Sequence, residues 1–185
     1  VDVFGVVAST GGPPALAQLL GSLPGDLPIP LLIAQHITEG FTDGLVRWLS
    51  GVTPLKVQIG DSGGACHPGH VYLAPDGHHL EVDPDGLMRT PRGYGGHCPS
   101  GNRLLASLAR SYGARAGGIV LTGMGDDGAQ GLLQIKESGG QTIAQDAATS
   151  VVYGMPQAAV TLKAAQAQLP LEAMGPMILE LCQRQ

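Results

Sequence analysis

The stretch that decides the fold is Val3-Phe4-Gly5-Val6-Val7-Ala8-Ser9-Thr10-Gly11-Gly12-Pro13-Pro14. It begins with a short, continuous apolar run, which is typical of a strand buried on both faces. A polar, glycine-rich turn follows, and two prolines stand where the first turn of a helix tolerates them. The apolar residues 15–20 continue that helix up to Gly21. The stretch therefore predicts a strand, a tight turn and a helix, which is the repeating unit of a parallel α/β sheet.

Two further apolar runs end in polar side chains in the same way. Residues 30–35 lead into His36, and residues 117–122 lead into the loop Gly123-Met124-Gly125-Asp126-Asp127-Gly128. The carboxyl ends of parallel strands lie along one edge of an open α/β sheet, so side chains delivered there by different strands can converge. We therefore expect Ser9, His36 and an aspartate of this loop to share one site.

The rest of the chain predicts further elements of the same fold. Residues 41–49 and 102–112 are expected to be helices, and the glycine- and proline-rich residues 92–101 an irregular loop that borders a cleft. Short runs between residues 55 and 90 are separated by Pro75-Asp76-Gly77 and Pro84-Asp85-Gly86, which predicts an antiparallel hairpin insertion. The second half predicts a helix over 128–138, a strand over 141–144, a helix that begins at Met155-Pro156, and a last helix near 171–181. The expected fold is a single α/β domain with a doubly wound, mainly parallel sheet, helices on both faces and the hairpin insertion.

Composition and charge exclude several classes of protein. The formal net charge is −5 and the ten Lys and Arg residues are scattered, unlike the basic stripe of a nucleic-acid-binding protein. The longest apolar runs are strand-sized, far short of the roughly 20 residues that span a membrane, and the N-terminus shows no secretory leader. Cys66, Cys98 and Cys182 form no Cys-x-x-Cys pair, so we expect free thiols rather than disulfides or a zinc site. A cytoplasmic protein with no nucleic-acid partner and no membrane insertion is expected.

The three converging side chains suit acyl transfer. Ser9 is a weak nucleophile unless a base removes its proton, and His36 could be that base. The base needs a carboxylate on its other ring nitrogen, which Asp126 or Asp127 could supply. Backbone N–H groups of the turn at residues 9–12 and of the loop at residues 123–125 could stabilise the oxyanion that forms.

Each of these residues also has a plainer interpretation. The turn at residues 9–12 resembles a helix cap or an anion site, and the Gly-x-Ser-x-Gly elbow of many serine hydrolases is absent. His36 could be structural, and the paired aspartates could cap the helix that begins near Gly128 or ligate magnesium. A non-catalytic nucleotide- or phosphate-binding α/β module that uses the Ser9–Gly12 turn is therefore the alternative function.

The remaining histidines divide into three groups. His78 and His79 flank a predicted turn and are expected to be solvated. His67 and His70 lie three residues apart without acidic partners at ligand spacing, so no metal site is expected there. His97 lies in the irregular loop, and we expect it to touch substrate.

Motifs along almost the whole chain resemble the catalytic domain of the CheB family, the protein-glutamate methylesterases and glutamine deamidases of bacterial chemotaxis. The motifs that carry this resemblance are Ala8-Ser9-Thr10-Gly11-Gly12-Pro13, Gln35-His36-Ile37, Gly40-Phe41-Thr42, Pro68-Gly69-His70-Val71-Tyr72-Leu73-Ala74-Pro75, Leu121-Thr122-Gly123-Met124-Gly125-Asp126-Asp127-Gly128, Thr142-Ile143-Ala144-Gln145-Asp146 and Ala148-Thr149-Ser150-Val151-Val152-Tyr153-Gly154-Met155-Pro156.

The resemblance implies a role for each matching residue. The nucleophile of the family falls on Ser9, its base on His36, and its orienting aspartate on Asp127. Thr10 and Met124 fall on positions that line the active site, Met124 through its backbone N–H. No metal or organic cofactor is implied.

The resemblance also implies an activity and partners. The family hydrolyses γ-glutamyl methyl esters on the cytoplasmic helices of chemoreceptors, releasing methanol, and can deamidate glutamine. The implied partners are those receptor helices and a receiver domain that usually precedes the catalytic domain. Residues 1–185 are expected to be the catalytic domain alone, and whether a receiver domain was removed or is naturally absent stays open.

One motif departs from the family. The family commonly has Gly-His-Arg-Pro-Ser-Val-Asp where this chain has Gly96-His97-Cys98-Pro99-Ser100-Gly101-Asn102, so a positive and a negative side chain are replaced by neutral ones. None of the three triad residues is changed. We expect this departure to affect which receptor is preferred.

Overall fold

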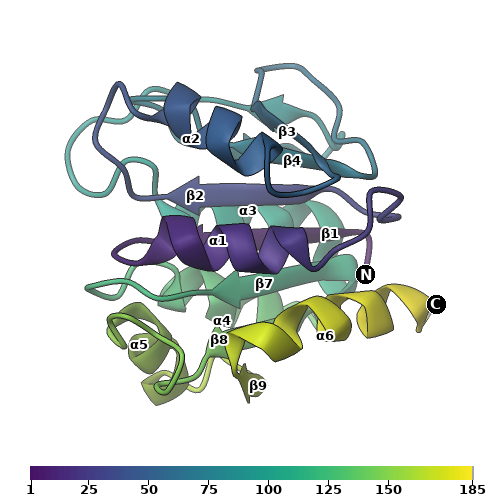
Figure 1. Cartoon of the computed structure of the whole chain (residues 1–185). Helices are drawn as coiled ribbons and strands as arrows, with labels where there is room; N and C mark the ends of the chain where they lie inside the picture. Colours follow the sequence, from purple (N-terminus) through teal and green to yellow (C-terminus); the bar gives the residue numbers. More distant parts are fainter. Residues whose placement is uncertain (185) are drawn as a thin grey trace.

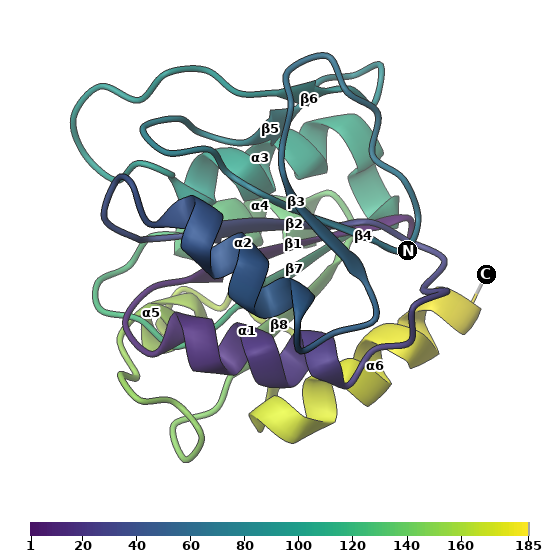
Figure 2. The ribbon, with the colours of Figure 1, turned by 45° about the horizontal axis from the view of Figure 1, so that its top comes forward.

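The computed structural model describes residues 1–184, and its centre is a seven-stranded parallel sheet with the strand order β3-β4-β2-β1-β7-β8-β9. Figures 1 and 2 show this sheet between two layers of helices. The strands are β1 (Val3–Ala8), β2 (Leu31–Gln35), β3 (Lys56–Ile59), β4 (His70–Leu73), β5 (Glu81–Val82), β6 (Met88–Arg89), β7 (Ala116–Val120), β8 (Gln141–Gln145) and β9 (Ala167–Leu169). The helices are α1 (Gly12–Gly21), α2 (Thr42–Ser50), α3 (Gly101–Tyr112), α4 (Ala129–Glu137), α5 (Met155–Thr161) and α6 (Leu171–Gln183), with one 3₁₀ turn (Gly113–Arg115).

The central strand β1 explains the layering, because its side chains enter both cores. Phe4 and Val6 pack with α1, α2 and α6 on one face of the sheet, whereas Val7 packs with α3, α4 and α5 on the other. Every residue of β1 is buried. A strand buried on both faces needs apolar residues at every position rather than at alternate ones, which is the pattern read from the sequence.

The structure confirms the predicted α/β class and the doubly wound parallel sheet, but the prediction for residues 55–90 was partly wrong. Only β5 and β6 form the expected antiparallel hairpin, around the turn Pro84-Asp85-Gly86. The earlier runs, β3 and β4, pair in parallel and belong to the main sheet. The segment 60–69 carries the chain back past the short strand β3, so that β4 starts at the same end. Because that return segment contains no helix, the residues resemble a hairpin in the sequence.

The strand order reverses between β1 and β7, and this reversal positions the site. From β1 the chain crosses one face of the sheet through α1, and from β7 it crosses the other face through α4. The two connections diverge beyond the carboxyl ends of the strands and leave a crevice there, the usual place for a ligand in open α/β sheets. Ser9 follows β1, His36 follows β2, and the Asp127 loop follows β7.

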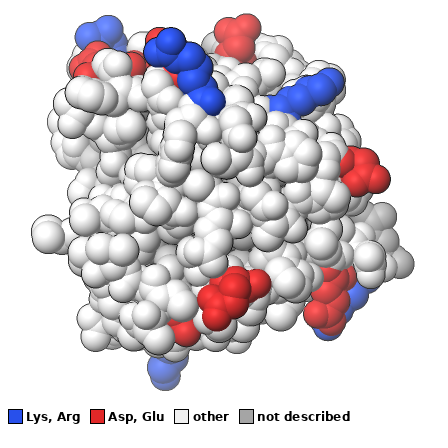
Figure 3. Space-filling model, in the orientation of Figure 1, with Lys and Arg blue, Asp and Glu red and all other residues white. Residues whose placement is uncertain are grey.

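The face drawn in Figure 3 bears few charged side chains, and most of them lie near its rim, where some acidic and basic side chains are adjacent. No helix within residues 1–184 is both long and apolar enough to cross a membrane.

Candidate active site

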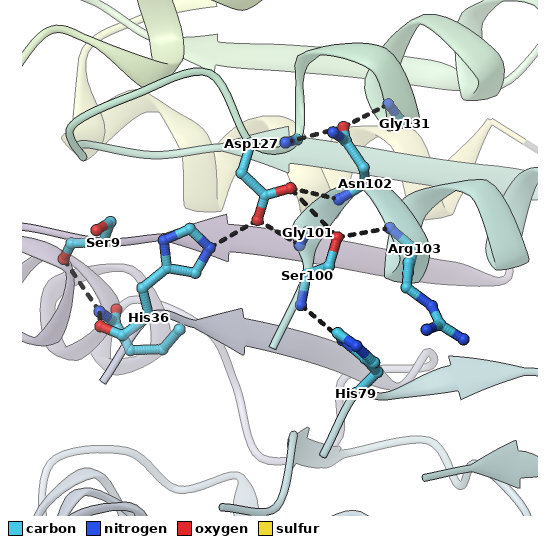
Figure 4. Close-up of polar contacts among 11 residues, drawn as sticks. Ser9, His36, His79, Ser100, Gly101, Asn102, Arg103, Asp127 and Gly131 are labelled. Carbon is cyan, nitrogen blue, oxygen red and sulfur yellow. Dashed lines mark hydrogen bonds and ion pairs between the residues drawn. The ribbon is translucent and has the colours of Figure 1, made fainter. Parts of the chain in front are cut away.

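Asp127 and His36 form a close polar pair at this edge of the sheet. The Nε2 atom of His36 lies 2.6 Å from Oδ2 of Asp127, whose side chain is only 2 % exposed (Figure 4). The same carboxylate accepts the backbone N–H of Gly101 at 2.6 Å and that of Asn102 at 2.9 Å. These are N–H groups of the first turn of α3, so the positive end of that helix also favours the negative charge.

The surroundings of Asp127 keep it ionised. Burial raises the pKa of the carboxyl group, but the hydrogen bonds from His36, Asn102 and Gly101 outweigh burial and hold the pKa below its usual value. An ionised carboxylate can only accept hydrogen bonds, so Nε2 of His36 is the donor. The neutral ring then keeps Nδ1 to accept a proton from elsewhere.

Ser9 and His36 are brought together by the register of their strands. Ala8 pairs with Gln35, and the N–H of His36 donates to the carbonyl of Ala8 at 2.9 Å, so the two following residues are neighbours. Figure 4 shows the His36 ring between Ser9 and Asp127. Within the described residues no hydrogen bond joins the Ser9 hydroxyl to the ring. For Nδ1 to take a proton from Ser9, the hydroxyl would have to turn toward the ring, as apo sites often require.

Gln35 links Ser9 and His36 through hydrogen bonds to both. Its buried Nε2 donates to the carbonyl of Ser9 at 3.0 Å and to the carbonyl of His36 at 2.9 Å. Its Oε1 has no partner within the described residues and lies where a Cβ at Gly12 would be. The sequence analysis did not single out Gln35, although a polar residue that ends an apolar strand is a signal of this kind.

The loop after β7 lies directly against Ser9. The N–H of Ser9 donates to the carbonyl of Thr122 at 3.0 Å, and a Cβ at Gly123 would lie 2.7 Å from Cβ of Ser9. The next residue, Met124, has an exposed side chain, and its N–H has no partner within the described residues. The N–H of Thr10 likewise has no partner there. Two backbone donors are therefore available beside Ser9.

His97 stacks on His36. The rings of His97 and His36 are 4.7 Å apart between centroids and within 7° of parallel. Ligand atoms of His36, His97 and Asp127 lie within 4.8 Å of one another, a spacing that a metal ion could bridge. A ligating imidazole holds the metal in its own ring plane, however, and two stacked rings have no plane in common. The structure therefore places these residues together without directing their ring nitrogens at one point.

The prediction for His79 was wrong. This residue is buried, 4 % exposed, and its Nδ1 accepts the N–H of Ser100, the N-cap residue of α3, at 3.0 Å. Burial lowers the pKa of His79, and the nearby charge of Arg103 lowers it further. The adjacent turn folds back against the loop before α3, since the N–H of His79 also bonds to the carbonyl of Pro91. This contact joins segments that are distant in sequence, so the local turn signal could not reveal it.

Comparisons with known proteins identify the family of the chain. The family described as CheB methylesterase matches residues 4–178. The chain belongs to the CheB methylesterase family. The resemblance noted from the sequence motifs is thereby confirmed.

Relatives in the CheB family match almost the whole chain. A "Protein-glutamate methylesterase/protein-glutamine glutaminase 3" of Myxococcus xanthus is 59% identical over 98% of this chain and 51% of its own length. The "Protein-glutamate methylesterase FrzG" of the same species is 47% identical over 95% of this chain and 53% of its own length. The chain therefore spans about half the length of these curated relatives.

A solved structure of a CheB catalytic domain confirms the fold. The crystal structure of the Thermotoga maritima CheB methylesterase catalytic domain superposes with a TM-score of 0.92 at 31% identity. The match covers 97% of this chain and 98% of that one.

Proposed function

We propose that residues 1–185 form the catalytic domain of a protein-glutamate methylesterase that uses a Ser9–His36–Asp127 triad. The substrate would be γ-glutamyl methyl esters on the cytoplasmic helices of chemoreceptors, and the protein would act in the cytoplasm. The observation that carries this proposal is the buried Asp127 carboxylate, which bonds to His36 beside a serine at the end of β1. The printed names of the relatives support the same activity.

In the proposed mechanism, Ser9 Oγ attacks the ester carbonyl while Nδ1 of His36 takes its proton. Asp127 holds Nε2–H and stabilises the imidazolium that forms. The N–H groups of Met124 and Thr10, both without partners in the described structure, donate to the oxyanion. The imidazolium then protonates the departing methoxide, which leaves as methanol.

Water completes the cycle. It attacks the acyl-enzyme with His36 again as the base, and the products are the glutamate carboxylate and free Ser9. The same steps on a glutamine carboxamide would release ammonia instead of methanol, which accounts for deamidation. No step needs a metal or an organic cofactor.

The test is methanol release from methylated receptor by the wild type and by Ser9→Ala. We expect the variant to lose nearly all activity, leaving the roughly 10³- to 10⁴-fold acceleration over water that binding and oxyanion donors supply. Ser50→Ala is a matched control, because that hydroxyl is exposed on α2 and, among residues 1–184, bonds only to the carbonyl of Val46. Retention of more than a tenth of the activity by a folded Ser9→Ala protein would remove Ser9 from the mechanism.

A second measurement addresses the phosphate-binding alternative. A serine-reactive organophosphorus reagent should modify Ser9 in the wild type and leave His36→Gln unmodified, because only an activated hydroxyl attacks it. A turn that binds phosphate without chemistry would show no such labelling. The hydrogen bond between His36 and Asp127 favours the hydrolase, since an anion-binding turn needs neither residue.

A further inference from the structure

The starts of α3 and α4 are joined by a reciprocal exchange of hydrogen bonds. Asp127, at the start of α4, accepts N–H groups of Gly101 and Asn102 at the start of α3. In return, the side-chain Oδ1 of Asn102 accepts the N–H of Gly128 at 3.0 Å and of Gly131 at 2.9 Å. Asn102 is the single asparagine of the chain, and Figure 4 shows it between the carboxylate and α4.

Asn102 therefore contacts the Asp127 segment through both its backbone and its side chain. Its backbone bonds to Oδ1 of the carboxylate, and its side chain bonds to Gly128, the next residue. The direction of the carboxylate toward His36 therefore depends on Asn102. The departure from the family at this position lies within the hydrogen bonds of Asp127, whereas the sequence led us to expect an effect on which receptor is preferred.

The charge of the residue at this position matters separately from its hydrogen bonds. An aspartate side chain would cap α4 about as well as an asparagine does. It would, however, bring a second carboxylate next to a buried one, and like charges disfavour ionisation of both. Two neighbouring carboxylates would also favour the protonated form of the His36 ring, which cannot act as a base.

We propose that Asn102 is a positioning residue for Asp127, and that its neutral side chain lets His36 stay unprotonated at lower pH than an aspartate there would. This inference rests on the proposed function only where it speaks of His36 as the base. The other titratable groups around His36 and Asp127 are His97 stacked on His36, His79 behind Ser100, Arg103 on α3, and Asp126 beside Asp127.

The test compares three variants. Asn102→Asp keeps the acceptor and adds a charge, and Asn102→Ala removes the acceptor. Gln130→Glu adds the same charge in the first turn of α4, on an exposed side chain that lines the same groove as Asn102. The readouts are the NMR titration of the His36 ring, assigned with His36→Gln, and the pH dependence of kcat/KM for methanol release.

We expect Asn102→Asp to raise the midpoint of the His36 titration, and the acidic limb of kcat/KM, by about one pH unit, with thermal stability near that of the wild type. Gln130→Glu should move both by less than a third of that, because solvent screens its charge. Asn102→Ala should lower kcat and stability without shifting the acidic limb of the pH dependence of kcat/KM.

An unchanged His36 midpoint in Asn102→Asp, or an equal shift in Gln130→Glu, would overturn the proposal. So would wild-type kcat in Asn102→Ala, because Asn102 would then not position Asp127. The NMR titration needs no substrate. If the midpoint moves while no variant and no wild-type protein releases methanol, the proposed function fails and the electrostatic part of this inference stands.

Discussion

At the scale of single residues, two adjacent aspartates have opposite surroundings. Asp127 is 2 % exposed and accepts hydrogen bonds from His36 and the start of α3, whereas the side chain of Asp126 is exposed. We predict that Asp127→Asn lowers turnover by up to about 10⁴-fold, because an amide favours the wrong imidazole tautomer and cannot offset the imidazolium charge. Asp126→Asn should keep nearly normal turnover. Both are measured by methanol release at neutral pH.

The two variants should also differ in stability. In Asp127→Asn a single amide oxygen would have to replace two carboxylate oxygens that accept N–H groups, so one buried donor loses its partner at a cost of about 1–3 kcal/mol. Urea unfolding measures this loss. Equal and modest losses of turnover in both variants would contradict the triad and indicate a shared electrostatic role.

Some residues of the candidate site could be predicted from the sequence, and others could not. Ser9 and His36 follow continuous apolar runs, so their meeting could be predicted from strand ends alone. Spacing left Asp126 and Asp127 equivalent, and only the family motif chose between them. Asn102, Gln35 and His79 could not be placed, because their partners lie 20 or more residues away and depend on which loops pack together.

At the scale of elements, the loop after β7 packs on the Ser9 turn through a glycine. A Cβ on Gly123 would lie 2.3 Å from Sδ of Met155 and 2.7 Å from Cβ of Ser9. The methionine can move, but Ser9 cannot move without its turn. We predict that Gly123→Ala costs about 1–3 kcal/mol of stability and lowers turnover at least tenfold.

A matched glycine serves as the control for this prediction. Gly44 lies within α2, and a Cβ there meets nothing within 4 Å. Gly44→Ala should therefore leave turnover unchanged and stabilise the protein by up to about 1 kcal/mol, because alanine favours a helix. Normal turnover in folded Gly123→Ala would mean that the loop does not fix the position of Ser9.

We expect the stability of the protein to depend on pH through His79, which accepts a hydrogen bond from Ser100 at the start of α3. The folded protein lowers the pKa of this histidine, whereas the unfolded chain binds the proton near pH 6.5. Its stabilising contribution is thus present above pH 6.5 and is lost as the pH falls toward the lower folded pKa. We predict that the free energy of unfolding of the wild type falls between pH 7 and 5 more steeply than that of His79→Asn, by at most about 1.4 kcal/mol per pH unit.

Urea unfolding at several pH values measures this difference. The amide oxygen introduced by His79→Asn would accept the N–H of Ser100 without titrating, so the cap of α3 is kept. Parallel slopes for His79→Asn and the wild type would show that burial of His79 does not set the pH dependence.

The elements differ in how well the sequence predicted them. Those with continuous apolar runs or proline at their start, such as β1 and α1, were placed almost to the residue. The outer strands were predicted with the wrong pairing or were missed. The sequence predicted β3 and β4 as part of an antiparallel hairpin, and the three-residue strand β9, Ala-Gln-Leu, is partly exposed and too short to show a strand pattern.

At the scale of the whole molecule, one sheet supports both cores. Phe4 and Val7 of the same strand face opposite helix layers, so unfolding of either layer would expose one face of the sheet to water. We therefore predict that residues 1–185 unfold as one cooperative unit, although chains above about 150 residues often show intermediates. Two probes can test this, because the single tryptophan, Trp48, lies on α2, and Cys66 packs against the core on the opposite face.

The measurement compares Trp48 fluorescence with pulsed thiol labelling of Cys66 in urea, in a Cys98→Ser/Cys182→Ser background. Burial raises the pKa of the Cys66 thiol to about 11, so the folded protein should label slowly at pH 8 and unfolding should expose a reactive thiol. We expect the two transitions to have the same midpoint. If Trp48 changes at clearly lower urea than Cys66 labels, α2 and the edge strands separate first, and the two helix layers do not depend on each other through the sheet.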